Sequence, residues 1–434
     1  RRWTHFWPSR REACSRIAGP RSQATHARMT QDRLSRYFTG VAAKRLSAVE
    51  ADVLRSNQHE VNGVESLKRL FGSASGRQQF PARFIYLTDS ADDAVVSDGF
   101  LTWYDARERH PTRSERRLYF PTTSVSKRAT EGDLLVIGRR PDGSALVVIA
   151  ARDSTVANQV QWLFGLANLE RPGYSVRDEL ASDRDRIAFA SRLILESIGI
   201  TVEPPPDTHL DDMLRQFGGE FPSTQEFSTY ARSTVREEFP ADGQDAALMA
   251  WMDREEVLFR TLERHLITGR LSRGFRNDVD GFIAFSLSVQ NRRKSRVGYA
   301  LENHLEHIFK LAGIRFARAK VTENRSRPDF LFPGVAEYKD PAFCPRHLTM
   351  LGVKASCKDR WRQVLAEADR IKNKHLLTLE SAISVNQTDE MRAKRLRLVV
   401  PRQIHATYAP PQREWLMDVA TFSTLVRQRQ VNLA

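Results

Sequence analysis

Three consecutive prolines at residues 204–206 interrupt the chain near its midpoint. Proline fixes φ and has no backbone N–H, so a run of three ends any helix and favours an extended polyproline segment instead. The 434 residues also exceed what a single hydrophobic core usually holds. We therefore predict two domains, over residues 29–200 and 216–434, joined by a linker over residues 201–215.

The two halves carry different patterns of apolar residues. Before the prolines the sequence has short apolar runs with β character at residues 84–87, 133–138 and 145–150. The last two runs are separated by a Pro-Asp-Gly sequence, which is typical of a hairpin turn. After the prolines helical spacing dominates, and then helix and strand patterns alternate at 295–312, 329–332, 350–357, 360–374 and 397–400. The sequence thus predicts an α+β two-domain protein, with a β-rich N-terminal domain and an α/β C-terminal domain.

Positive charge is unevenly distributed along the chain. Lys and Arg number 67 against 53 Asp and Glu, and the resulting net charge of +14 points to a polyanionic partner, most often nucleic acid. Residues 1–28 hold seven arginines and one glutamate, so they contribute +6 of this total and leave +8 for the rest. That segment has no apolar stretch of the kind a secretory signal needs, and we expect it to be a disordered leader.

Cysteine content and hydropathy bear on the compartment. The three cysteines, Cys14, Cys344 and Cys357, are too few and too scattered for a disulfide framework or a zinc site. The sequence has no uninterrupted apolar stretch of about 18 residues, so we predict no membrane span. Both observations fit a cytoplasmic protein.

A lysine in the middle of a predicted strand marks the candidate active site. In residues 350–358 (MLGVKASCK) apolar and polar positions alternate, and Lys354 has apolar neighbours, although burying an ammonium group is costly. Asp329 opens an earlier apolar strand, and Glu367 lies thirteen residues after Lys354 in a segment with helical spacing. We expect the three side chains to converge at one edge of a sheet.

Such a trio suits hydrolysis of a phosphodiester. Carboxylates bind a hard divalent cation such as Mg²⁺. The cation activates a water, and a lysine stabilises the negative charge that develops on the phosphate. The alternative interpretation is structural, with Lys354 simply paired with Asp329 or Glu367, and spacing alone leaves both interpretations open.

The flanking segments supply further candidates. Glu302 lies on the predicted helix over residues 295–312 and is either another metal-side carboxylate or part of a solvated face. His304 and His307 are three residues apart, whereas the zinc-binding His-Glu-x-x-His pattern needs four, so we predict that they bind no metal. Basic residues suited to contact DNA phosphates, which position a duplex without reading its sequence, are Arg292, Arg293, Lys294, Arg296, Lys358, Arg360 and Arg362.

The C-terminal half carries a family resemblance. Runs such as RPDFLFPGVAEY, CKDRWRQ and RLRLVVPRQIH, within residues 282–405, resemble the catalytic domain of the EcoRII family of type II restriction endonucleases, which belongs to the PD-(D/E)xK nuclease superfamily. The resemblance implies a restriction-endonuclease-like fold and a catalytic trio of Asp329, Lys354 and Glu367. It also implies Mg²⁺ held by Asp329 and Glu367, with Glu302 as a helix carboxylate. The remaining site-lining residues that it implies are Tyr338, Lys358 and Arg360.

One position departs from the superfamily pattern. The acid expected two residues before the catalytic lysine is Gly352 here. A carboxylate relocated to Glu367 would restore the missing ligand. The departure bears on how the metal is coordinated.

The N-terminal half resembles the effector domain of the same family, a β-pseudobarrel related to plant B3 DNA-binding domains. The resemblance lies in the run WYDARERHPTRSERR at 103–117, with Arg45–Ser47 and His59 as a second recognition arm. Arginine can bind guanine bidentately, and glutamate can accept from cytosine, so this loop suits a G·C-rich site. Departures are Pro111, where a lysine is expected, and the lack of an aromatic residue after His59. The implied DNA-reading residues are Arg107, Arg113, Glu115, Arg116, Arg117 and His59.

Together these resemblances imply a homodimeric, Mg²⁺-dependent endonuclease that cuts double-stranded DNA at a short CCWGG-like site and leaves 5′-phosphate ends. They further imply autoinhibition by the effector domain until a second site is bound, and a cognate cytosine methyltransferase in the same system that is not a physical partner. Two other classes stay open. One is a repair or mobile-element nuclease with no fixed site, and the other is a non-catalytic, B3-like DNA-binding regulator.

Overall fold

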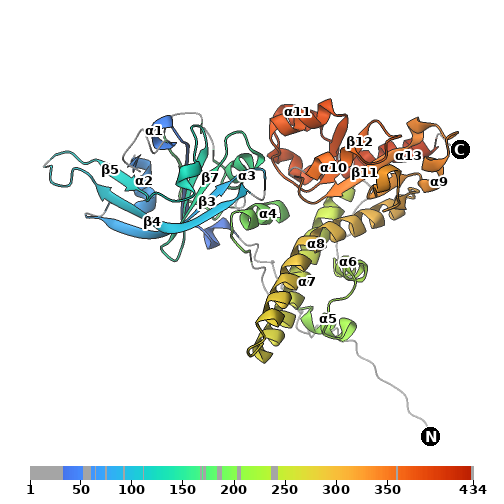
Figure 1. Cartoon of the computed structure of the whole chain (residues 1–434), viewed down its shortest axis with the longest axis horizontal. Coiled ribbons are helices and arrows are strands. Elements are labelled where there is room, and N and C mark those ends of the chain that lie inside the picture. Colours follow the sequence, from blue (N-terminus) through green and yellow to red (C-terminus); the bar gives the residue numbers. More distant parts are fainter. Residues whose placement is uncertain are drawn as a thin grey trace, which may run out of the picture. The chain divides into compact units, whose positions relative to one another are not determined.

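The structure is a computed structural model that describes residues 33–51, 60–63, 65–73, 76–90, 93–110, 112–166, 169, 173–182, 188–202, 207–235, 243–357 and 360–431. The predicted leader over residues 1–28, His59, Pro111, Lys358 and the three prolines lie outside these residues. Within them, two β-sheets with separate hydrophobic cores lie on either side of the prolines in the sequence (Figure 1). This arrangement agrees with two domains, while their exact boundaries stay a prediction.

The N-terminal sheet has eight strands in the order β2-β5-β4-β3-β7-β6-β1-β8. Neighbouring strands are antiparallel except for β3 and β7, which run parallel. The strands are β1 (Gly40–Arg45), β2 (Glu60–Gly63), β3 (Gln78–Leu87), β4 (Val95–Asp105), β5 (Arg116–Tyr119), β6 (Leu134–Arg139), β7 (Ala145–Ala150) and β8 (Ser175–Arg177). The helices are α1 (Ala48–Ala51), α2 (Glu65–Phe71), α3 (Thr155–Leu163) and α4 (Phe189–Ser197), with 3-10 turns at Leu34–Arg36 and Ser126–Arg128.

Burial on both faces explains why β6 and β7 are continuously apolar. In β7, Leu146 and Val148 belong to a core with α3 and α4, whereas Val147 and Ile149 belong to the core on the opposite face. A strand that is covered on both sides has no polar positions to alternate with its apolar ones. The predicted hairpin is confirmed, with Gly143 in its turn at a φ of +83°.

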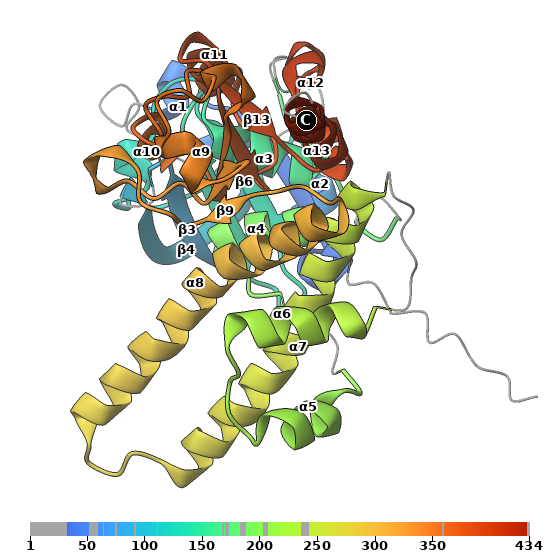
Figure 2. The ribbon, with the colours of Figure 1, turned by 90° about the vertical axis from the view of Figure 1, so that its right-hand side faces the viewer.

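A helical region follows the prolines, with α5 (Leu210–Phe217), α6 (Thr224–Ser233), α7 (Gln244–Arg273) and α8 (Val279–Leu311). Helix α5 begins inside the segment predicted as linker, so residues 210–215 are helical instead. A capping box at Ser223 and Glu226 starts α6. Helices α7 and α8 form a long hairpin (Figure 2) whose turn begins at Gly274, with a φ of +70°.

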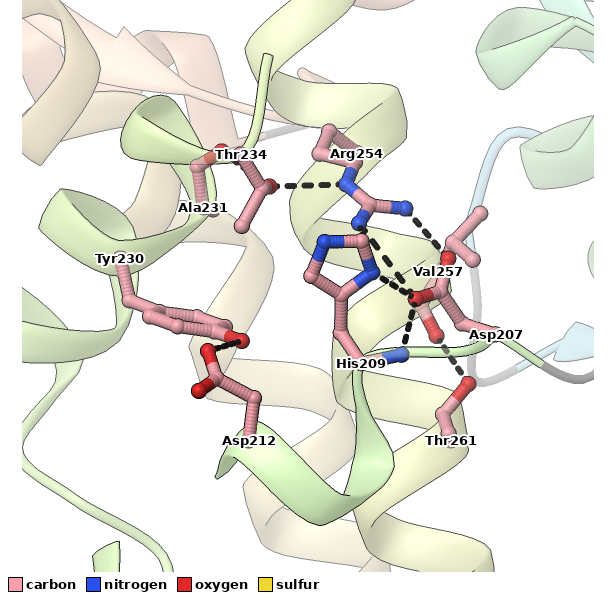
Figure 3. Close-up of polar contacts among 9 residues, drawn as sticks. All are labelled: Asp207, His209, Asp212, Tyr230, Ala231, Thr234, Arg254, Val257 and Thr261. Atoms are coloured by element: carbon pink, nitrogen blue, oxygen red, sulfur yellow. Dashed lines mark hydrogen bonds and ion pairs between the residues drawn. The ribbon is translucent and has the colours of Figure 1, made fainter. Parts of the chain in front are cut away.

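A polar cluster ties the chain to α7 directly after the prolines (Figure 3). The carboxylate of Asp207 accepts a hydrogen bond from Arg254 of α7, and its Oδ1 lies 2.7 Å from Nδ1 of His209. Arg254 also donates to Oγ1 of Thr234 at 2.8 Å, so one guanidinium joins the start of this region to the end of α6. Asp207 is therefore tied to α7 and, through Arg254, to the end of α6.

The C-terminal sheet has five strands in the order β13-β12-β11-β10-β9. They are β9 (Ala317–Arg318), β10 (Phe330–Phe332), β11 (Thr349–Lys354), β12 (Lys374–Thr378) and β13 (Leu396–Val399). The pairs β9–β10 and β10–β11 are antiparallel, whereas β11, β12 and β13 are parallel. The helices are α9 (Val335–Lys339), α10 (Trp361–Leu365), α11 (Val385–Ala393), α12 (Pro410–Trp415) and α13 (Val419–Val431), with 3-10 turns at Glu323–Arg325, Pro345–His347 and Arg402–Thr407.

The mixed sheet agrees with the predicted α/β domain, with one error. Strands β10, β11 and β13 fall where the sequence predicts them. The predicted helix over residues 360–374 is wrong, because only Trp361–Leu365 is helical and Ala368 has a φ of +51°, a left-handed conformation that ends a helix. Strand β12 then begins at Lys374 and was missed.

None of the helices that the structure describes is long and apolar enough to cross a membrane.

Candidate active site

Asp329 and Lys354 meet at one edge of the C-terminal sheet. Asp329 directly precedes β10, Lys354 ends β11, and the two strands are antiparallel neighbours with Phe330 opposite Leu351. Oδ2 of Asp329 accepts a hydrogen bond from the backbone N–H of Val353 at 2.6 Å and lies 3.3 Å from Nζ of Lys354. Both side chains keep some exposure, 17% and 22% of their surfaces. The ion pair is therefore fixed by the backbone yet open to a bound molecule.

Glu367 completes the cluster from the turn after α10. Burial, followed by the negative charge of Asp329, raises the pKa of its carboxyl from 4.5 to about 7, while Lys354 and Lys374 act to lower it. Its Oε2 is buried and accepts no hydrogen bond from any residue that the structure describes. A half-buried carboxylate with an unsatisfied oxygen beside a second carboxylate is suited to bind a cation.

Packing explains why position 352 is glycine. A Cβ atom on Gly352 would lie 2.9 and 3.0 Å from the two methyl carbons of Val364 in α10, closer than side-chain atoms normally approach. An acid at this position would therefore push α10 away from the sheet. Glu367 lies two residues beyond the end of the helix that occupies this space.

Glu302 lies on α8 and is held by an arginine of β9. Nη2 of Arg318 donates to Oε2 of Glu302 at 2.9 Å, and Nη1 donates to Oε2 of Glu306 at 2.6 Å. Burial is the main cause that raises the pKa of Glu302, and the charge of Asp329 adds to it. Glu302 is therefore not freely solvated, and it is available to a ligand only together with its bound arginine. Arg318 was missed because β9 has only two residues and no pattern of its own.

Tyr338 is buried, with 2% of its surface exposed. Its hydroxyl donates to Oε2 of Glu323 at 2.5 Å, and burial together with this bond raises its pKa. Arg370 donates to the backbone carbonyl of Tyr338 and to two neighbouring carbonyls. This geometry favours a positioning role for Tyr338 over contact with a substrate.

Two arginines of the basic cluster in α8 pair with acids of α7, and one of them is buried. Arg296 is 7% exposed and paired with Glu256 of α7, so it is not free to contact a phosphate, contrary to the prediction. Arg293 makes an ion pair with Glu263 at 2.8 Å, and Arg292 lies over the ring of Phe221. The sequence shows the charges of these arginines, whereas their partners in α7 and at Phe221 become apparent only in the structure.

Several predicted phosphate contacts are exposed at the surface. One pocket is lined by Arg293, Lys294 and Arg360, together with Ser356 just beyond β11. Arg362 is exposed and pairs with Glu390 at 2.9 Å. A basic pocket beside the strand that ends in Lys354 is a natural place for a DNA backbone.

In the N-terminal domain, an aspartate organises the predicted DNA-reading loop. Asp105 accepts from the hydroxyl of Ser114 and from two backbone N–H groups, and these bonds lower its pKa to about 2. Glu115 then pairs with Arg107 at 2.6 Å and Arg117 at 2.8 Å. Arg116 donates to the carbonyl of Ser73, whereas Arg113 is exposed in the loop. The loop therefore presents arginines that are positioned by carboxylates.

A lysine and two carboxylates at the edge of a mixed sheet are typical of hydrolases that cut nucleic acids. The family model for the EcoRII C terminal domain matches residues 259–423. The type II restriction enzyme EcoRII of Escherichia coli is 41% identical over 399 residues, which cover 89% of this chain and 93% of that protein. The chain belongs to the EcoRII family of type II restriction enzymes, which are DNA-cleaving hydrolases.

Solved structures similar to this chain include two restriction endonucleases. Metal-depleted Ecl18kI in complex with uncleaved DNA has a TM-score of 0.42 and 17% identity, over 51% of this chain and 83% of that one. The complex of restriction endonuclease PspGI with substrate DNA has a TM-score of 0.41 and 16% identity, over 49% of this chain and 94% of that one.

Proposed function

We propose that this restriction endonuclease cuts both strands of duplex DNA at a short CCWGG-like site, with Mg²⁺ as its cofactor, and leaves 5′-phosphate ends. The observation that carries the proposal is the cluster of Asp329, Lys354 and Glu367. Oδ2 of Asp329 lies 3.3 Å from Nζ of Lys354, and the charges of both residues act on the pKa of Glu367. A purely structural ion pair would not need a second carboxylate with an unsatisfied oxygen.

The donor set fits a magnesium ion. No three His, Cys, Asp or Glu side chains in the described part of the chain are grouped to hold a metal, so the protein would supply two ligands, Asp329 and Glu367. Mg²⁺ commonly binds through one or two carboxylates and keeps several waters or phosphate oxygens. When bound, it supplies an activated water and offsets the charge on the phosphate. Lys354, held by Asp329, places its ammonium group where negative charge develops at phosphorus.

The test is plasmid cleavage by the full chain with Mg²⁺. We expect discrete bands, no cleavage in EDTA, and a loss of about 100- to 1000-fold in Lys354→Ala, the scale seen when one charge-stabilising donor is removed. Lys372→Ala is a matched control, because that side chain is exposed. Cleavage by Lys354→Ala at the wild-type rate would refute the assignment, and a smear would favour the nuclease with no fixed site.

We infer a homodimer as the working form, since one catalytic cluster addresses one strand and a duplex has two. The N-terminal domain would read an effector copy of the site as a B3-like module, with contacts to bases from Arg107, Arg113 and Arg117. A cognate cytosine methyltransferase would protect the host DNA. A cytoplasmic location fits this substrate and the scattered cysteines.

We also propose that the N-terminal domain restrains cleavage. Support comes from hydrogen bonds that join α3 to the segment after β12. Nε2 of Gln159 donates to Oε1 of Glu380 at 3.2 Å and to the carbonyl of Ser381 at 3.0 Å. Glu380 also accepts from the backbone of Cys357, three residues beyond Lys354. Effector DNA would activate the enzyme if it binds preferentially when these bonds are open.

A further inference from the structure

Glu367 is positioned by a turn. Helix α10 ends at Leu365, Ala366 is its C-cap, and the left-handed Ala368 turns the chain toward β12. The last carbonyls of a helix have no partners within it, so a short helix such as α10 needs donors from elsewhere to fix its end. The direction of the Glu367 carboxylate depends on how those carbonyls are held.

Lys374 provides the donors. It begins β12 with only 8% of its surface exposed, and its Nζ donates to the carbonyl of Leu365 at 2.7 Å and to the carbonyl of Glu367 itself. The two bonds lie on either side of Ala366 and so clamp the turn. A buried ammonium is costly unless it is paired and hydrogen-bonded. Both bonds go to the turn that carries Glu367.

We propose that Lys374 is a positioning residue that fixes Glu367 for metal binding. The inference rests on the proposed role of Glu367 as a metal ligand. Because a side chain on Gly352 has no room beneath Val364, the carboxylate has to come from a turn outside the sheet. A ligand on a strand is held by the sheet, whereas a ligand on a turn needs its own support. Lys374 joins the turn to β12 and so gives Glu367 the rigidity of the sheet.

The charge of Lys374 strengthens the same two hydrogen bonds. A hydrogen bond donated by an ammonium group is charge-assisted and stronger than one donated by a neutral group. An apolar side chain of similar length would lose both the charge and the two hydrogen bonds. An arginine would retain the charge and several donors.

The experiment measures how tightly full-length variants bind Mn²⁺. Binding is detected as a loss of the EPR signal of the free ion, at a temperature well below the unfolding midpoint of each variant. We expect Lys374→Met to weaken binding by about 10- to 100-fold, the range for residues that support a metal ligand. Lys374→Arg should recover most of the affinity, and Lys372→Met, an exposed neighbour, should leave it unchanged. A lower unfolding midpoint with unchanged Mn²⁺ affinity in Lys374→Met would overturn the inference.

Two additions keep the result decisive. If Lys374→Met does not fold, Lys374→Gln replaces it. Glutamine is uncharged and one bond shorter than lysine, so it cannot keep both bonds, and wild-type affinity in that variant overturns the inference equally. Wild-type protein and Glu367→Gln are measured alongside. If the wild type binds no Mn²⁺, or if Glu367→Gln binds it normally, the role of Glu367 fails, which is a separate outcome from a failure of Lys374 alone.

Discussion

Replacing Glu367 by glutamine should abolish cleavage and, in EDTA at pH 8, stabilise the protein. The pKa of Glu367 rises from 4.5 to about 7 on folding. Between these two pH values the folded protein keeps a proton on Glu367 that the unfolded chain has lost. At about 1.4 kcal/mol per pH unit, the cost of ionising this carboxyl in the folded state is about 3 kcal/mol. Glutamine keeps the shape and removes that cost, so we expect about 2–3 kcal/mol of added stability.

The pH dependence distinguishes this explanation from a general packing effect. Because the folded pKa is raised, the wild type loses stability as pH rises from about 4.5 to 7 and changes little above that range. The difference between Glu367→Gln and the wild type should therefore be near zero at pH 4.5 and reach its full value at pH 8. Urea unfolding in EDTA at a series of pH values measures it. A constant difference across this range, or a loss of stability at pH 8, would refute the reasoning.

Further perturbations test other parts of the structure. Gly352→Ala should cost about 1–3 kcal/mol of unfolding free energy, since its Cβ would press on Val364; unchanged urea unfolding would contradict this. Arg296→Met should destabilise by about 3 kcal/mol, because it leaves Glu256 buried without one partner, and salt-dependent DNA binding should hardly change; a weaker salt dependence would instead indicate a phosphate contact. Gln159→Ala should speed cleavage of single-site DNA several-fold in initial-rate assays if the α3 contacts restrain the enzyme, and equal rates would argue against restraint there.

Local patterns predicted much of this molecule, and long-range packing decided the rest. The β6–β7 hairpin and the pairing of Asp329 with Lys354 follow from alternation and turn residues, which act over a few positions. The end of α10 does not, because it depends on a lysine nine residues after Leu365 that reaches back to the helix. The basic residues of α8 mislead for a related reason. Their charge is visible in the sequence, whereas the acids of α7 that neutralise Arg293 and Arg296 lie some 30 to 40 residues earlier.

The proposed relocation of the carboxylate to Glu367 would give this site a structural asymmetry. Asp329 is fixed by a backbone N–H of the neighbouring strand, so the sheet itself determines where its oxygens lie. Glu367 is fixed through the end of a five-residue helix, whose packing against Gly352 excludes an acid on β11. The contact between Gly352 and Val364 therefore leaves no room for an acid at position 352, and it also fixes the helix that precedes Glu367. It follows that movement of α10 would displace Glu367 while leaving Asp329 and Lys354 in place, so metal binding should be more sensitive than the ion pair to changes in this helix.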